Sequence, residues 1–291
     1  MLLGCLSLYA ADNDLITKQI TIKLEKAGTL PDRIESSKKY KITNLKIIGE
    51  INGTDLKMIR DMAGRTDEFN STDGKLSVLD LSKAKIVEGG DSYYCYLGHY
   101  YYTSNDVIGR SAFDDCSGLT SLTLPAGITK ISYDAFNGCS GLTSFTLPAG
   151  ITSIDYGAFY DCSELTSLTL PAGITEIGEK AFEGCSGLTS IYVYAEKVPY
   201  MFYHAFEGVD AKKCTLYVPM GTRDDYRLSG FGDYFENIVE FDATGIDKTT
   251  TSTDVEEVAR YSVNGQRLSA PTKGMIIVKY SDGSVKKVAI R

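Results

Sequence analysis

The stretch AFNGCSGLTSFTLPAGITSIDYG, residues 135–157, is preceded and followed by near copies of itself. Ala-Phe pairs recur every 23 residues from Ala112-Phe113 to Ala181-Phe182, and a fifth pair, Ala205-Phe206, follows after 24. A fixed period in the twenties is typical of a solenoid, in which each repeat is one rung that buries its apolar side only by stacking on its neighbours. The sequence therefore predicts a repeat solenoid.

One copy of the repeat contains a strand and a turn. Leu122-Thr123-Leu124 alternates apolar and polar side chains as a half-buried strand does, and Pro125-Ala126-Gly127 then turns the chain. Equivalent strands in successive rungs run in the same direction. We therefore expect a parallel β ladder along the solenoid.

Four cysteines keep the 23-residue step: Cys116, Cys139, Cys162 and Cys185. Equivalent positions on stacked rungs lie about 4.8 Å apart with parallel Cα–Cβ bonds, which suits neither a tetrahedral zinc site nor a disulfide. Free cysteine behaves as a small buried hydrophobe. We interpret the four thiols as packing residues, with metal or disulfide chemistry as the alternative. The phenylalanines of the Ala-Phe pairs are predicted to form a core spine.

The strands carry a row of hydroxyl side chains on their outward face. The row consists of Ser121, Thr123, Ser144, Thr146, Ser167, Thr169, Ser190 and finally Tyr192. Binding sites usually combine varied anchors such as Tyr and Arg, so a monotonous row favours a solvated face. Hydrogen bonding to a long, repetitive partner is the alternative.

The pattern LTSLTLPAGITKISYDAFNGCSG, residues 119–141, resembles the BspA-like leucine-rich repeat of surface and secreted proteins of anaerobic Gram-negative bacteria. The LxxLxLP run, the Ile pair, the Ala-Phe pair and the Cys all match. The resemblance covers about residues 40–241. It implies an extracellular solenoid used in adhesion, with host matrix proteins and other bacteria as partner classes, and it assigns no catalytic residue.

The flanks complete the predicted organisation. The strand Thr215–Pro219 is expected to end the stack, and Thr54 is the candidate N-cap of a helix beginning near Asp55. The expected parts are 1–11, a signal-peptide remnant; 12–111, an N-terminal cap of divergent leucine-rich repeats with a Tyr-rich insertion; 112–241, leucine-rich repeats and a C-terminal cap; 242–257, a linker; and 258–291, a small C-terminal β-hairpin unit.

Both ends of the sequence carry expectations about secretion. MLLGCLSLYAADND resembles the back half of a signal peptide, with lipidation of Cys5 as the alternative to removal. The last segment, residues 258–291, resembles the C-terminal sorting segment of Bacteroidetes-type secreted proteins, with a capping hairpin as the alternative. Together they predict a secreted or outer cell-surface protein.

Two tyrosine clusters interrupt the regular repeat and are the candidate binding residues. They are Tyr93, Tyr94, Tyr96, Tyr100, Tyr101 and Tyr102 in one cluster, and Tyr192, Tyr194, Tyr200 and Tyr203 in the other. Tyrosine offers a large contact area at low entropic cost, and insertions between rungs tend to project from one face. A hairpin folded back over the end of the stack is the alternative interpretation of the first cluster.

Charge and motif content point away from catalysis and nucleic acid. Residues 112–204 contain 10 acidic and 3 basic residues, whereas phosphate binding needs clustered Lys and Arg. The Asp114-Asp115 pair is replaced in later copies, so it is interpreted as a solvated surface position. Neither of the two histidines, His99 and His204, has the spacing of a metal or nucleophile site. We expect no enzyme activity, no cofactor and no metal.

The sequence thus predicts a non-catalytic extracellular or cell-surface binding protein, an adhesin that contacts host or bacterial surface proteins. A glycan-binding or structural scaffold component of the cell surface is the alternative. The absence of Trp counts modestly against stacking on sugars. Neither the ligand nor the oligomeric state follows from the sequence.

Overall fold

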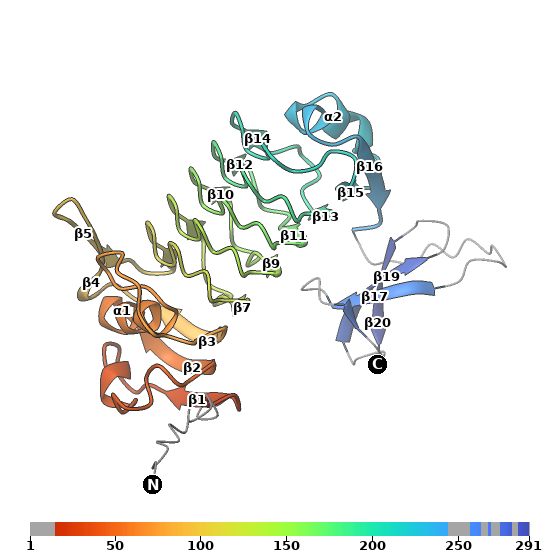
Figure 1. Cartoon of the computed structure of the whole chain (residues 1–291). Coiled ribbons are helices and arrows are strands. Elements are labelled where there is room, and N and C mark those ends of the chain that lie inside the picture. Colours follow the sequence, from red (N-terminus) through yellow and green to blue (C-terminus); the bar gives the residue numbers. More distant parts are fainter. Residues whose placement is uncertain (1–14, 244–256, 263–266, 269–273, 281–284, 291) are drawn as a thin grey trace, which may run out of the picture.

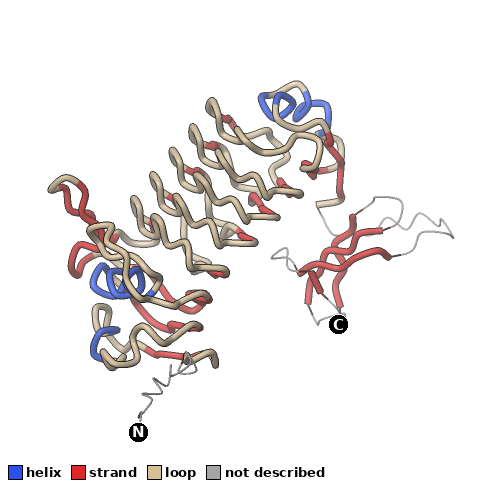
Figure 2. Tube along the Cα trace, viewed as in Figure 1, coloured by secondary structure: helices blue, strands red, loops and turns tan. Residues whose placement is uncertain are grey.

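The computed structural model describes residues 15–243, 257–262, 267–268, 274–280 and 285–290, and its main body is a stack of parallel rungs (Figure 1). Most of each rung is loop and turn, with only short strands (Figure 2). This follows from the repeat, because a rung of 23 residues must turn the chain back to the same edge before the next strand begins. The predicted parallel solenoid of leucine-rich repeats is confirmed.

One side of the stack is a long parallel ladder. In spatial order its strands are β1 (Ile20–Lys23), β2 (Asn44–Ile51), β3 (Val78–Ile86), β7 (Ser121–Thr123), β9 (Ser144–Thr146), β11 (Ser167–Leu170), β13 (Ser190–Val193), β15 (Thr215–Pro219) and β16 (Asn237–Phe241). β15 pairs with β16, so the prediction that Thr215–Pro219 is the last strand is wrong. The sequence of β16, NIVEF, lacks the LxxLxL pattern that marks the other rungs, although its apolar residues still alternate.

A second parallel ladder runs along the opposite edge of the rungs. Its two-residue strands are β6 (Val107–Ile108), β8 (Lys130–Ile131), β10 (Ser153–Ile154), β12 (Glu176–Ile177) and β14 (Tyr200–Met201). The second residue of each strand points inward and is buried in the first four, whereas Met201 is only partly buried. The core therefore lies between the two ladders.

The phenylalanines of the Ala-Phe pairs form the predicted spine. Adjacent rings stack with centroid separations of 5.4, 4.9, 5.1 and 5.1 Å along the series Phe113, Phe136, Phe159, Phe182 and Phe206. All five side chains are at most 1% exposed. The spacing is close to the rung spacing of about 4.8 Å, so the backbone hydrogen bonds of the ladders fix the ring separation.

The repeated cysteines lie beside this spine and are buried free thiols, as the packing interpretation predicted. Three of them donate a hydrogen bond to the carbonyl of the phenylalanine 26 residues earlier, at 3.0 Å for Cys139, 3.2 Å for Cys162 and 3.1 Å for Cys185. Each thiol thus satisfies a buried carbonyl between rungs. Burial also raises the pKa of Cys116 to about 11.

We expect these thiols to be unreactive in the folded protein, because the thiolate is the nucleophile and both burial and the raised pKa suppress it. Iodoacetamide labelling followed by peptide mass spectrometry checks this. Half-buried Cys95 serves as the internal control and should react first. Labelling of Cys139 or Cys162 at the rate seen in urea contradicts the packing interpretation.

The N-terminal cap contains the helix α1 (Gly53–Met62), which packs beside the hairpin formed by β4 (Gly89–Tyr96) and β5 (His99–Thr103). The N-cap of α1 is Asn52, and the expectation of Thr54 is wrong. The Asn52 side chain accepts the Thr54 backbone N–H at 3.1 Å, and Asp55 accepts the Asn52 N–H at 3.0 Å. Counted from Asn52 as the N-cap, Asp55 occupies position N3, from which its side chain completes the capping box.

The C-terminal end is closed by two short helices, α2 (Arg223–Arg227) and η2 (Gly230–Asp233); η1 (Leu30–Asp32) lies at the other end. A separate four-stranded antiparallel sheet follows, with β17 (Glu257–Ser262), β18 (Arg267–Leu268), β19 (Gly274–Tyr280) and β20 (Val285–Ile290) in the order β18-β17-β19-β20. Both turns of the expected hairpin unit, the predicted signal-peptide remnant (residues 1–11) and most of the predicted linker (residues 242–257) lie outside the described residues.

This C-terminal sheet contacts the long ladder. Ile277 packs with Tyr192, Tyr217 and Phe241 in one buried cluster, and Tyr261 lies against the same cluster. The outward row of hydroxyls is not solvated throughout: Thr123 is exposed, whereas Thr169 is buried and Tyr192 packs in the cluster with Ile277. The prediction of a solvated face is therefore wrong at Thr169 and Tyr192.

Candidate binding surface

The structure separates the ten candidate tyrosines into buried and exposed groups. Buried are Tyr93, Tyr94 and Tyr192; half-buried are Tyr101 and Tyr194; exposed are Tyr96, Tyr100, Tyr102, Tyr200 and Tyr203. Sequence clustering could not separate them, because exposure depends on what packs over each ring: the adjacent residues Tyr93 and Tyr94 are both buried. In the first cluster, Tyr93 and Tyr94 pack against the stack and Tyr96, Tyr100 and Tyr102 face solvent, and their role in binding stays a prediction.

Tyr93 and Tyr94 fix the hairpin to the first regular rung. The Tyr93 hydroxyl donates to the carbonyl of Arg110 at 2.9 Å, and the Tyr94 ring packs edge-on against Phe69 at 5.0 Å. Burial raises the pKa of Tyr94 to about 12 and that of Tyr93 further. These two side chains therefore position the hairpin and are not available to a ligand.

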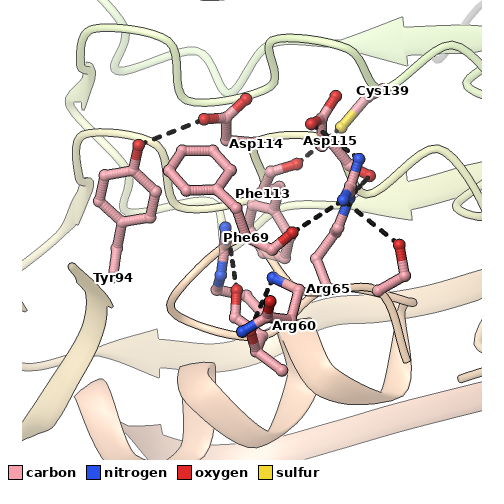
Figure 3. A network of polar contacts seen from close by, with 11 residues as sticks. Arg60, Arg65, Phe69, Tyr94, Phe113, Asp114, Asp115 and Cys139 are labelled. Atoms are coloured by element: carbon pink, nitrogen blue, oxygen red, sulfur yellow. Dashed lines mark hydrogen bonds and ion pairs between the residues drawn. The ribbon is translucent and has the colours of Figure 1, made fainter. Parts of the chain in front are cut away.

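A buried polar network lies beneath Tyr94 at the same junction (Figure 3). The Arg60 side chain is fully buried, donates to the Ser111 carbonyl at 2.6 Å, and lies 5.3 Å from the centre of the Tyr94 ring. Tyr94 donates to the carboxylate of Asp114 at 3.5 Å. Asp114 is 7% exposed, so its interpretation as a solvated position is wrong.

Burial raises the pKa of Asp114 to about 7, although the Arg60 guanidinium opposes this shift. The nearby Asp115 and Asp134 carboxylates add to it, while Asp115 itself pairs with Arg65 at 2.9 Å. A carboxyl group with a raised pKa marks many catalytic sites. At Asp114 the burial that raises the pKa also keeps the carboxyl group from solvent. The residue joins the N-terminal cap to the repeats.

A row of aromatic side chains runs from the hairpin along the second ladder. Tyr133 and Tyr156 follow β8 and β10, are 49% and 39% exposed, and stack with ring centroids 6.5 Å apart. The Arg110 guanidinium lies 5.6 Å from the centre of the Tyr101 ring and 5.8 Å from that of Tyr133. We call Tyr101, Arg110, Tyr133 and Tyr156 the tyrosine ridge.

The ridge arises from one position of the repeat. Arg110, Tyr133, Tyr156 and Glu179 follow one another at 23-residue steps, and Tyr203 follows after 24. Equivalent positions on adjacent rungs are neighbours, which places the side chains in a line. Sequence analysis missed Tyr133 and Tyr156 because it searched for local clusters. Both tyrosines are found when the outward-facing position of each repeat is compared with the equivalent position of the next repeat.

The hydroxyl face offers less to a partner. Its aromatic end, Tyr192 and Tyr217, stacks at 4.5 Å and is covered by the C-terminal sheet. In Figure 1 that sheet and the β4–β5 hairpin lie at opposite sides of the rung stack. On the hairpin side, Tyr133 and Tyr156 of the tyrosine ridge stay exposed, as do the five exposed tyrosines of the two clusters.

Two further features concern the described residues alone. None of their helices has the length and hydropathy of a membrane span. They also contain no group of three or more His, Cys, Asp or Glu side chains arranged to hold a metal ion.

The comparison with known protein families agrees with the repeat architecture. A family model described as "BspA type Leucine rich repeat region" matches residues 106–222 in six copies. A search of curated proteins finds no match. A solved structure titled "The Crystal structure of Pneumococcal vaccine antigen PcpA" aligns with 71% of this chain at 17% identity and a TM-score of 0.38; the alignment spans 60% of that protein.

The family match begins at β6 and ends before α2, so it coincides with the regular rungs and stops where the closing helices begin. The rungs between those points contain the Phe spine, the cysteines and most of the tyrosine ridge. The resemblance to the BspA-like leucine-rich repeat is thereby confirmed over residues 106–222, and the bacterial group stays a prediction. The chain carries a BspA-type leucine-rich repeat region, and residues 106–222 belong to that repeat family.

Proposed function

We propose that this chain is a non-catalytic binding protein of the cell surface or extracellular space, and that it contacts a protein partner through the tyrosine ridge. The supporting observation is the stacked pair of exposed tyrosines, Tyr133 and Tyr156, with Arg110 held between the ring of Tyr133 and that of half-buried Tyr101. Tyr and Arg are the residues most enriched at binding hot spots, and here they replace the small polar residues common on the other face. Solenoids of this kind typically serve as interaction scaffolds.

Ring orientation favours a protein over a glycan. Tyr133 and Tyr156 stack nearly parallel, at 24°, and Arg110 covers a face of Tyr101 and of Tyr133. A sugar needs an open ring face, whereas a protein can pack against ring edges and hydrogen-bond to tyrosine hydroxyls. Glycan binding remains the second candidate, because Tyr200 and Tyr203 are 64% and 81% exposed.

The double variant Y133S/Y156S tests the proposal. Immobilised collagen, fibronectin and laminin are the probes for matrix proteins, and a glycan array is the probe for sugars. Each lost tyrosine costs about 1–2 kcal/mol of binding free energy. The double variant should therefore bind at least tenfold more weakly to whichever matrix protein binds the unmodified chain. The matched control is Leu228→Ser, which removes an 86% exposed apolar side chain near the closing helices.

Equal retention of the double variant and the unmodified chain on the same matrix protein excludes the ridge as the binding surface. Retention on glycans alone, lost in a Y200S/Y203S variant, supports the second candidate instead. Far-UV circular dichroism of each variant checks that the repeat stack is intact, as expected because Tyr133 and Tyr156 are both exposed.

A further inference from the structure

The column of equivalent outward residues in the tyrosine ridge continues past Tyr156 to Glu179 and Tyr203, beside β10, β12 and β14 (Figure 1). Backbone hydrogen bonds join these rungs: the Glu179 carbonyl accepts the Gly157 N–H at 3.0 Å, and the Tyr203 carbonyl accepts the Lys180 N–H at 3.3 Å. The residue after each column member has a left-handed φ between 54° and 61°, at Asp134, Gly157, Lys180 and His204. This shared backbone geometry places Glu179 between the two tyrosines.

Glu179 offers an unpaired carboxylate between two exposed rings. Tyr156 and Tyr203 are 39% and 81% exposed, and Glu179 is half-buried. Among the residues that the structure describes, the Glu179 carboxylate has neither an ion pair nor a hydrogen bond. The adjacent Lys180 does not neutralise it, because the Lys180 ammonium pairs with Glu183 at 3.4 Å. The charge of Glu179 is therefore open to a partner.

The first part of the same column shows which group fits between two such rings. The Arg110 guanidinium lies 5.6 and 5.8 Å from the ring centres of Tyr101 and Tyr133. It also lies 3.8 Å from the carboxylate of Asp134. The rings on either side of Glu179 are two rung steps apart, or about 10 Å at the usual strand spacing. A gap of this size, with a carboxylate in it, matches the arrangement around Arg110 and lacks only the planar cation.

The charges around Glu179 also favour a cation. The outer edges of its rung and of the two beside it, residues 153–161, 176–184 and 200–208, contain six acidic side chains, one Lys and one His. Three of the acids contact a basic side chain: Asp155 with Lys130, Glu183 with Lys180 and Glu207 with His204. The other three, Asp161, Glu176 and Glu179, make no ion pair among the described residues. The turn before β14 adds Glu196 and Lys197, whose charges cancel. This edge therefore attracts basic groups.

We propose that Tyr156, Glu179 and Tyr203 form a subsite for an arginine side chain of a basic protein partner. This inference rests on the proposed function and specifies the chemistry of the partner. A guanidinium stacks on aromatic rings and pairs with a carboxylate in one plane, and it is more weakly hydrated than the ammonium of lysine. The surrounding acids steer further basic residues of the same segment toward the edge. The partner thus presents an exposed, arginine-rich segment.

Fluorescence anisotropy of the full chain with a labelled arginine-glycine repeat peptide tests the subsite at about 150 mM salt, where distant charges are screened. A peptide with citrulline in place of arginine keeps the planar shape, removes the charge and should bind at least fivefold more weakly. Glu179→Gln and Tyr203→Ser should each weaken binding of the arginine peptide at least fivefold. The matched control Glu164→Gln removes an exposed carboxylate three residues before β11 of the other ladder, and should leave binding within about twofold.

Equal behaviour of the two peptides toward the unmodified chain overturns the inference, as does equal binding of the arginine peptide to the E179Q and E164Q variants. Retention on the immobilised matrix proteins separates this inference from the proposed function. If the Y133S/Y156S variant loses retention and E179Q keeps it, the ridge binds protein without an arginine subsite, and only this inference falls. If neither variant loses retention, both fall. Loss with both variants, together with competition by the arginine peptide and not the citrulline peptide, supports both.

Discussion

Phe159→Ala should lower the free energy of unfolding by about 3–5 kcal/mol, the usual range for removing a buried phenyl ring. Phe159 is fully buried at the centre of the spine, 4.9 Å from Phe136 and 5.1 Å from Phe182, and Phe145 lies 5.0 Å away. Rings fixed by ladder hydrogen bonds cannot collapse into the cavity. Because rungs are stabilised by their neighbours, the loss also weakens the coupling between the two halves of the stack.

Urea unfolding followed by circular dichroism measures this effect. Tyr156→Ala is the matched control: it removes an aromatic ring from the same rung, but one that is 39% exposed and on the surface ridge. We expect that control to cost less than about 1 kcal/mol. Equal losses from the two variants contradict the assignment of one ring to the core and the other to the binding surface.

Asp114→Asn should stabilise the protein at pH 8 and leave it nearly unchanged at pH 4. The folded-state pKa of Asp114 is about 7, above the ordinary value of 3.8. Between these values the unfolded chain releases a proton that the folded chain retains, so stability falls as pH rises through this window. About 1.4 kcal/mol per pKa unit gives an upper bound of about 4 kcal/mol for the gain.

Denaturation midpoints between pH 4 and pH 8 check this prediction. The wild type should lose stability across the range, and D114N should show a shallower slope. Some dependence remains, because burial also raises the pKa of Asp134. Asp115→Asn is the control, since it removes a half-exposed ion pair with Arg65 worth about 0.5–1 kcal/mol. A D114N variant that is less stable at pH 8 would falsify the assignment and make Asp114 the ionised partner of buried Arg60.

The regular rungs could be predicted from sequence because each obeys one rule. The 23-residue period specifies that Phe136 stacks on Phe113, and that Cys139 lies beside this spine, since equivalent positions of a solenoid are neighbours. The ends could not be predicted in the same way. Asn52 as N-cap, β16 as a further ladder strand and buried Asp114 all depend on contacts between segments that the repeat does not relate.

The candidate surface shows the same division. The sequence alone determined the solenoid, its period, its inward side chains and the presence of tyrosine clusters, because periodicity encodes which residues align from rung to rung. Tertiary structure decided which tyrosines are available: Tyr94 is buried by the cap, and Tyr192 is covered by the C-terminal sheet. Tyr133 and Tyr156 become a surface only when their rungs stack. Exposure depends on what packs over a residue, and the segments that cover these positions lie far away in the chain.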